Sequence, residues 1–166
     1  SMDTPFAPEA KHAYYQRFAQ SLQELNQEGV ELIPQTMAPF PWHFGGQRHQ
    51  NLFVRIEEIV DWCQRLGLRM CYDISHSSLT CNHFGLDLYD FTSRIAPYTA
   101  HLHLGDAKGV NGEGLQIGDG DLDFDRLGDI LAAGCPTASF IPEIWQGHKN
   151  GGEGFWIALE RLEGKL

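Results

Sequence analysis

A regular alternation of two kinds of segment constrains the fold of this chain more than any other feature of its sequence. Short runs rich in β-branched and aliphatic residues each precede a longer stretch with helix-forming composition. The predicted strands span 30–35, 68–74, 99–104 and 139–144, and the predicted helices span 8–28, 51–66, 85–95, 122–133 and 155–162. This order, one leading helix and then four strand–helix units, predicts an α/β fold with a parallel sheet and right-handed crossovers.

The predicted loops differ in character on the two sides of the sheet. Loops that follow a helix are short, whereas loops that follow a strand are long and rich in aromatic, polar or glycine residues. The loops after the strands are 37–46, the polar stretch 75–84, the glycine-rich stretch 105–121, and 146–152. Because function in parallel α/β folds lies at the carboxyl ends of the strands, we expect the site there.

Composition places further limits on the protein. The 166 residues suffice for a single domain with its own core, and a formal charge of −10 argues against a nucleic-acid surface, which needs a positive field. No apolar run is long enough to span a membrane, no leader is evident, and Ser1-Met2 resembles a cloning remnant. The four cysteines form no C-x-x-C pair, which is typical of reduced thiols in a cytoplasmic protein. These thiols are Cys63, Cys71, Cys81 and Cys135.

Each predicted strand carries, at or near its end, a side chain that can bind a cation. Side chains alternate between the two faces of a strand, so His101 and His103 share one face while the intervening leucines face the other. If those leucines face the helices, the cation-binding side chains converge on the opposite side. The predicted ligands are Gln35, Asp73, His103 and Glu143. This mixed nitrogen and oxygen set suits Mn²⁺, Zn²⁺, Co²⁺ or Mg²⁺.

Taken singly, each of these residues also has an ordinary structural interpretation. An aspartate at a strand end commonly caps a helix or turn, and a histidine in a strand is commonly a hydrogen-bonded core residue. Four such residues at matching positions favour a functional site over four separate structural roles.

Five stretches of the sequence can be compared with known families, namely GVELIPQT, CYDISHS, HLHLGDAKG, IGDGDLDF and FIPEIW. Together they resemble the last four strands of the xylose isomerase-like TIM barrel superfamily. That superfamily contains sugar and sugar-phosphate isomerases and epimerases and the endonuclease IV type of AP endonuclease. The D-x-x-H and H-x-H-x-x-D patterns are the most specific of these resemblances.

The resemblance assigns roles to individual residues. It implies that Asp73, His103 and Glu143 are metal ligands, that Glu143 also moves a proton, and that His76 contacts substrate or a second metal. Lys108 stands where the epimerases often place a substrate-binding arginine.

Two departures from the family pattern affect the expected chemistry. Gln35 aligns with a glutamate ligand, and its neutral amide leaves Glu143 as the remaining proton-transfer group of a carboxylate pair. A two-base epimerisation is therefore disfavoured relative to a one-base isomerisation or a lyase-type reaction. The nuclease branch needs a further Asp-x-His metal motif near 112–114, where Glu113 is the single candidate.

The resemblance also predicts an incomplete barrel. A complete (β/α)₈ barrel needs about 250 residues. We therefore expect a parallel (β/α)₄ half of a TIM barrel with a leading helix, forming one domain over residues 1–166. Such a half would expose sheet edges, so pairing with a second copy or with a missing N-terminal half is expected; an open α/β layer is the alternative.

Other residues are candidates for substrate binding. Trp42 and His43 lie in the aromatic loop and could stack on or hydrogen-bond to a sugar, although a hydrophobic plug is an equal interpretation. His101 accompanies His103 on the inner face. His148 lies in a glycine-rich loop that could cradle a phosphate or be a simple solvated turn.

These observations favour a metal-dependent isomerase or epimerase that acts on a small sugar or sugar phosphate through an enediolate. The alternative is a sugar-binding or regulatory barrel that has lost turnover, which Gln35 favours. An AP endonuclease-type phosphodiesterase is the third and weakest hypothesis.

Overall fold

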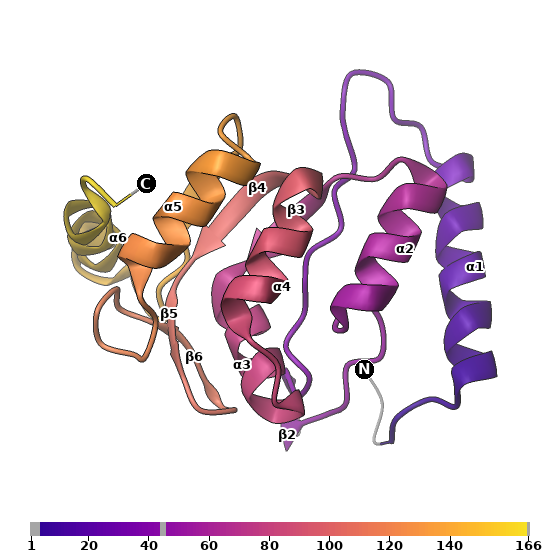
Figure 1. Cartoon of the computed structure of the whole chain (residues 1–166), viewed down its shortest axis with the longest axis horizontal. Helices are drawn as coiled ribbons and strands as arrows, with labels where there is room; N and C mark the ends of the chain where they lie inside the picture. Colours follow the sequence, from indigo (N-terminus) through magenta and orange to yellow (C-terminus); the bar gives the residue numbers. More distant parts are fainter. Residues whose placement is uncertain (1–3, 44–45, 166) are drawn as a thin grey trace.

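The computed structural model describes residues 4–43 and 46–165. Figure 1 shows the central strands behind a row of helices, with the first and the last helix at opposite ends of the molecule. The helices are α1 (Pro8–Glu24), α2 (Ile56–Leu66), α3 (Ile74–Phe84), α4 (Leu88–Ile95), α5 (Phe124–Gly134) and α6 (Lys149–Leu162), with a short 3-10 helix at Ala96–Tyr98. The strands are β1 (Trp42–His43), β2 (Gly46–Gln47), β3 (Met70–Asp73), β4 (Thr99–Leu104), β5 (Asp106–Lys108), β6 (Gly112–Leu115) and β7 (Ser139–Pro142).

A three-stranded parallel sheet in the order β3-β4-β7 forms the centre of the fold. Its register aligns Asp73 with His103, and His103 with Ile141, so that the three strands end at the same level. The predicted parallel α/β architecture is therefore confirmed, and three of the four predicted strands form.

The predicted first strand, 30–35, forms no regular strand. A single parallel bridge joins Gln35 to Cys71, supported by a hydrogen bond from the amide of Cys71 to the carbonyl of Pro34. Pro34 has no N–H to donate to a ladder, which limits how far this segment can pair. The segment still runs beside β3, so Gln35 reaches the same end of the sheet.

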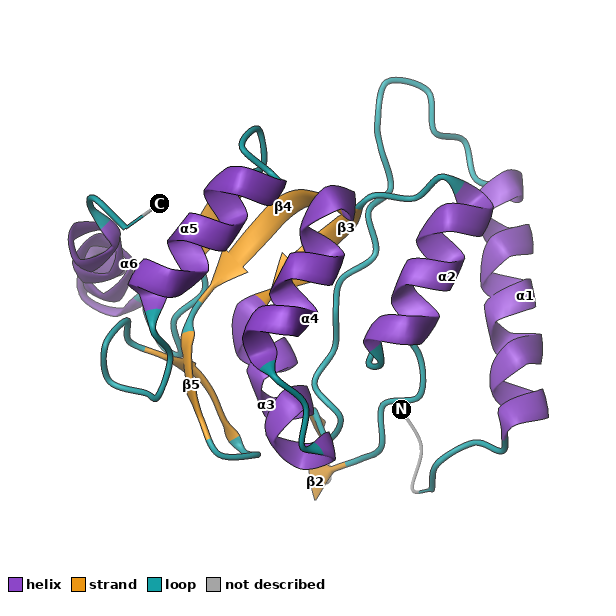
Figure 2. Ribbon diagram, in the orientation of Figure 1, coloured by secondary structure: helices purple, strands orange, loops and turns teal. Residues whose placement is uncertain are grey.

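Alternation along β4 separates the two faces of the sheet as expected. Leu102 and Leu104 are buried in the main core, packed with residues of the helices, whereas His103 points away from them. Helices α2, α4 and α5 stand side by side across the sheet (Figure 2). The hydrophobic core thus lies on one face and leaves the other for polar side chains.

The stretch 75–84, predicted to be a polar loop, is instead helix α3. Asp73 caps its amino end by accepting a hydrogen bond from the amide of His76. Leu79 and Cys81 on this helix are both buried, each in a different hydrophobic cluster. The serines that suggested a loop are buried near the cap, so tertiary packing and capping outweigh their weak helix propensity.

The glycine-rich stretch 105–121 is also more ordered than predicted. It contains the antiparallel hairpin β5–β6, and the buried carboxylate of Asp106 binds the backbone of the segment that follows the hairpin. That carboxylate accepts hydrogen bonds from the amides of Ala107, Gly118, Gly120 and Leu122 at 2.8–3.1 Å. A loop predicted from glycine content is therefore held in one conformation by a single side chain.

The helix boundaries shift modestly from their predicted positions. α1 ends at Glu24 rather than near residue 28, and α2 begins at Ile56 because Phe53 adopts a left-handed backbone conformation (φ 59°). α6 begins earlier than predicted, but residues 150–152 are not helical.

The predictions about the cysteines and about membrane-spanning segments can be compared directly with the structure. The four cysteines are free thiols, as predicted, and all four are buried. Within the described ranges, no helix has both the length and the apolar character that a membrane crossing requires.

Candidate functional site

The two carboxylate oxygens of Asp73 have different partners. Its Oδ1 accepts from the hydroxyl of Ser75 (3.0 Å) and the amide of His76 (2.9 Å), which caps α3. Its Oδ2 faces the opposite way, 2.8 Å from Nε2 of Gln35 and 3.1 Å from Nδ1 of His76. The capping interpretation and the ligand interpretation of this aspartate are therefore compatible, because they use different oxygens.

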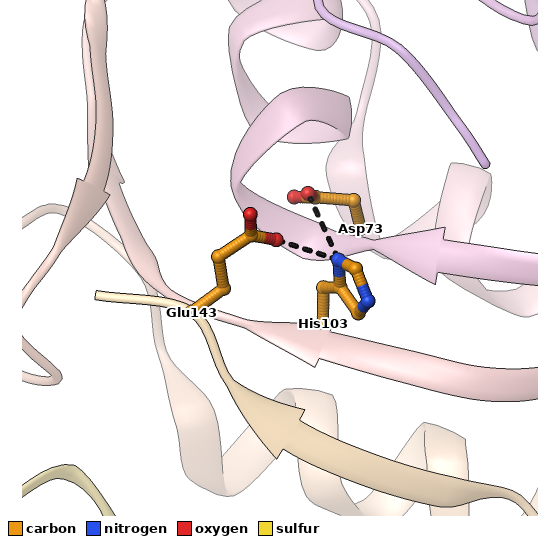
Figure 3. Close-up of side chains that lie close together, drawn as sticks. All are labelled: Asp73, His103 and Glu143. Carbon is orange, nitrogen blue, oxygen red and sulfur yellow. Dashed lines mark ion pairs between the residues drawn. The ribbon is translucent and has the colours of Figure 1, made fainter. Parts of the chain in front are cut away.

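His103 and Glu143 complete a cluster with Asp73, drawn in Figure 3. Nδ1 of His103 lies 2.5 Å from Oε2 of Glu143 and 3.9 Å from Oδ2 of Asp73. One donor atom from each residue lies within 4.8 Å of the other two. Glu143 comes directly after β7, and its amide donates to the carbonyl of Leu104, so backbone pairing sets its position.

The cluster shifts the acidity of its members. Hydrogen bonds to Cys71 and then to Glu143 raise the pKa of His103 to about 10. The hydrogen bond from His103 lowers the pKa of Glu143 below its usual range. Burial raises the pKa of Asp73 against the opposing charge of His76. The His103–Glu143 pair is thus an imidazolium and a carboxylate at neutral pH.

Gln35 reaches the cluster through its amide nitrogen. Nε2 donates to Oδ2 of Asp73 and lies 3.3 Å from Nδ1 of His103. The side-chain oxygen can act as a ligand beside these residues only after the amide turns over. The predicted fourth ligand is therefore brought to the site, but in a hydrogen-bonding orientation.

His76 stands at the inner edge of a cavity of about 530 Å³. Its Nδ1 lies 3.1 Å from the carbonyl oxygen of Thr36, and its Nε2 lies 3.5 Å from Oε2 of Glu113. Glu143 lines the same cavity. The other lining residues are Ser75, Gly114, Ile144, Trp145, Gln146, His148 and Lys149.

Of the predicted substrate-binding residues whose side chains are described, one lines the cavity and two do not. His148 lines the cavity, whereas His101 lies deeper on β4, with Nδ1 2.7 Å from the hydroxyl of Ser139. Lys108 is exposed at the end of β5 and does not line this cavity. The backbone of Trp42 and His43 forms β1, but their side chains lie outside the described residues.

The sequence did not indicate the contact of Cys71 with His103 or the position of Glu113 beside His76. Cys71 lies on the same strand face as Asp73 and touches His103, which strand alternation could have indicated. The sequence suggests for Glu113 only the role of a nuclease-type metal ligand. The structure places it on β6 beside His76, at the wall of the cavity.

The donor set fits a divalent cation. Two carboxylates and one imidazole converge from neighbouring strand ends, and Zn²⁺, Mn²⁺ and Co²⁺ accept such mixed nitrogen and oxygen ligands. The 4.8 Å spread of the donor atoms is compatible with a shared ion after small side-chain movements. The residues that would hold it are Asp73, His103 and Glu143.

The fold and the site define a parallel α/β protein with a carboxylate–histidine cluster at the carboxyl ends of its strands. The family described as Xylose isomerase-like TIM barrel matches residues 3–163, and the chain belongs to this family. No curated protein matches the chain.

Several solved structures resemble this fold. A D-tagatose 3-epimerase-like protein superposes with a TM-score of 0.63 at 17% identity over 92% of this chain. The probable 3-DHS dehydratase of petrobactin synthesis from Bacillus anthracis superposes with a TM-score of 0.69 at 13% identity over 100% of it. An L-ribulose 3-epimerase gives 0.63 at 14% identity over 86%. The chain spans 54%, 62% and 43% of these three structures, respectively.

Proposed function

We propose that the protein is a metal-dependent enzyme of the isomerase or epimerase type, acting on a small sugar or sugar phosphate. The observation that carries the proposal is the cluster of Asp73, His103 and Glu143 beside a cavity of about 530 Å³. The volume lies in the range of small-ligand sites. The epimerases and the dehydratase among the similar structures support the same class of chemistry.

Glu143 is the group best suited to take a proton from substrate. It is half exposed toward the cavity, and its lowered pKa keeps it ionised at neutral pH. A bound divalent cation, Mn²⁺, Zn²⁺, Co²⁺ or Mg²⁺, would polarise the substrate carbonyl and stabilise the charge of an enediolate. Glu143 would then remove the proton from the neighbouring carbon and return it to the adjacent one.

His76 is suited to orient a substrate hydroxyl. Its Nδ1 is held between the Thr36 carbonyl and the Asp73 carboxylate, which fixes the ring, while its Nε2 faces the cavity. His148 at the cavity wall offers a further polar contact for a hydroxyl or phosphate. In this proposal His101, two residues earlier on β4, packs edge-to-face against His103 and supports it. Lys108 would need the β5–β6 hairpin to move before it contacts substrate.

A second candidate function is sugar binding without turnover. The amide nitrogen of Gln35 donates to Asp73 Oδ2, the oxygen that a metal would use. This hydrogen bond stabilises the metal-free site and competes with the cation. A domain of this kind would bind a sugar in the cavity but would not move its protons.

We also propose that the outer edge of β7 is covered in the functional protein. Phe140 and Ile141 on this strand are 42% and 44% exposed, and Trp156 on α6 is 68% exposed. A second copy and a further part of the barrel are the two candidate partners. Light scattering of the purified chain separates them, because a stable dimer supports the first and a monomer supports the second.

The main experiment measures metal content and turnover together. We expect close to one divalent ion per chain, lost in the Asp73→Ala/His103→Ala double variant, and conversion of a ketose in a panel of ketohexoses, pentuloses and their phosphates. Glu143→Gln is expected to reduce turnover at least a hundredfold. Glu160→Gln on the exposed side of α6 is the matched control. Metal-free protein, or full turnover by Glu143→Gln, would contradict the proposal; sugar binding without turnover would support the second candidate.

A further inference from the structure

The loop that follows Glu143 supplies one wall of the reaction cavity. Half of the residues that line the cavity belong to the 144–149 loop, a short segment between β7 and the first residue of α6. The remaining lining residues include His76 and Glu143, the groups assigned to the reaction. The lining residues of the loop are Ile144, Trp145, Gln146, His148 and Lys149. Their chemistry therefore bears on which substrate the cavity accepts.

The backbone of the 144–149 loop is packed against two other elements. The amide of Trp145 donates a hydrogen bond of 2.7 Å to the carbonyl of Gly114, which joins the loop to the β5–β6 hairpin. The amide of Gly147 donates to the carbonyl of Ile144 at 2.8 Å. A Cβ added to Gly147 would lie 2.5 Å from a ring carbon of Phe155 on α6, so only glycine allows this close approach. The loop is thus held between the hairpin and α6.

Three side chains of this loop take little part in the packing of the protein. Trp145 is 77% exposed. The imidazole of His148 has no hydrogen bond, ion pair or ring contact with any residue that the structure describes. Nζ of Lys149 donates a hydrogen bond of 2.8 Å to the neutral amide oxygen of Gln146. Unpartnered side chains on a well-held loop beside a cavity are typical of ligand recognition.

The positive charge of Lys149 is not balanced within the described part of the chain. Lys165, which follows α6, pairs with Asp125 at 2.6 Å. Lys149 forms no such ion pair with any carboxylate of residues 4–43 and 46–165. A cation without an acidic partner is notable in a chain whose formal charge is −10. The cavity therefore has carboxyl groups at the strand ends and a cationic part on the 144–149 loop.

This distribution of charge indicates how an anionic substrate would lie. The carboxylates of the metal cluster offset the charge of a divalent cation, whereas Lys149 attracts a phosphate group as a point charge. His148 can donate a further hydrogen bond, and the indole of Trp145 offers an apolar surface to a carbon chain. A sugar phosphate bound in this way presents the carbons remote from its phosphate to Glu143. A free sugar would leave the charge of Lys149 without a partner.

We propose that the 144–149 loop binds the phosphate group of the substrate through Lys149 and His148, and that the substrate class is a sugar phosphate rather than a free sugar. This inference rests on the function proposed above and narrows its substrate class. Lys149 and His148 are binding residues in this assignment, and proton transfer stays with Glu143.

The test compares sugar phosphates with their unphosphorylated counterparts by calorimetry on the purified chain supplied with Mn²⁺. The pairs are D-fructose 6-phosphate with D-fructose, and D-ribulose 5-phosphate with D-ribulose. We expect wild type to bind at least one of the phosphates tenfold or more tightly than its free sugar. Lys149→Gln should weaken binding of that phosphate at least tenfold and leave binding of the free sugar within about twofold. His148→Gln should weaken binding of the phosphate about threefold.

Matched variants separate a direct contact from a general effect of charge. Lys165→Gln removes the same charge outside the cavity and should leave both affinities unchanged. Lys149→Arg keeps the charge and should bind the phosphate within about threefold of wild type. D-glucuronate, compared with D-glucose, tests a carboxylate in place of a phosphate. Its gain in affinity should be smaller, because a carboxylate carries one negative charge and a phosphate nearly two.

Four results would overturn the inference. The first is a wild-type chain that binds no sugar phosphate more tightly than the free sugar. The second is equal weakening by Lys149→Gln and Lys165→Gln, which would reflect net charge alone. The third is a loss in Lys149→Gln that is the same for the phosphate and the free sugar, which would assign Lys149 to the carbon chain or to loop structure. The fourth is an equal gain for D-glucuronate, which would contradict the assignment to phosphate.

Failure of the proposed function gives a different pattern. Binding of phosphates that depends on Lys149, without turnover of any of them, would contradict the isomerase or epimerase activity and support the assignment of the loop. Turnover of free ketoses that Lys149→Gln leaves unchanged would support the activity and overturn the assignment of the loop. Binding and turnover measured on the same variants therefore distinguish the two failures.

Discussion

His103 donates a hydrogen bond of 2.5 Å from Nδ1 to Oε2 of Glu143, so that two predicted metal ligands pair with each other through a proton. The imidazolium lies where the two carboxylates of the cluster converge, and the pair is stable because its charges are opposite and partly buried. A cation that binds both groups must displace this proton, and metal binding is consequently coupled to pH.

Metal affinity is expected to rise with pH. The pKa of His103 is raised to about 10, above the ordinary value of 6.5, so the free protein holds the proton throughout the neutral range. Mn²⁺ binding must release it, and affinity should increase by about tenfold per pH unit between pH 7 and 9. Calorimetry in buffers of different ionisation enthalpy would measure both the affinity and about one released proton. An affinity independent of pH would contradict the coupling.

Gln35→Glu should strengthen metal binding. The change replaces an N–H donor beside Asp73 Oδ2 by a carboxylate, which adds a negative ligand and removes the competing hydrogen bond. We expect Mn²⁺ affinity to increase at least tenfold at pH 8. Gln23→Glu on exposed α1 adds the same charge far from the cluster and serves as the control. Equal affinities in the two variants would show that Gln35 does not face the ion.

Asp73→Asn and Asp73→Ala should separate the two tasks of this residue. Asparagine keeps an oxygen that can cap α3 but removes the ligand charge, whereas alanine removes both. Both variants should lose metal, and Asp73→Ala should lose an additional ~1 kcal/mol of unfolding free energy, the usual contribution of a cap. Urea unfolding of the metal-free proteins would measure the difference. Equal stability of the two variants would rule out a capping contribution.

Asp106→Ala should be the most destabilising single change on the site side of the sheet. Four backbone amides donate to this carboxylate, and its loss would leave one buried and three partly buried N–H groups without this acceptor. Each such group costs about 1–3 kcal/mol, so a loss of at least ~3 kcal/mol is expected. Asp129→Asn on the exposed face of α5 is the control and should change stability by less than about 0.5 kcal/mol. A small effect of Asp106→Ala would show that water replaces the carboxylate.

The sequence by itself determined the class of fold and the members of the Asp73–His103–Glu143 cluster. Alternating strand and helix patterns require parallel connections, and the two-residue period of β4 places its leucines on the core side and His103 on the other. These conclusions rest on periodicity, a local property of the chain. The cluster of Asp73, His103 and Glu143 follows from the same period together with strand ends at one level.

Only the tertiary structure decided the features that depend on side chains distant in sequence. The serine-rich stretch after β3 is helical because Asp73 caps it and the sheet buries it, and the glycine-rich loop is ordered because Asp106 binds its amides. The same applies to Gln35, whose amide nitrogen is directed by Asp73, and to Glu113, which reaches His76 only through a docked hairpin. Composition reports what a segment prefers alone, whereas these outcomes depend on hydrogen bonds and burial that exist only once the chain has folded.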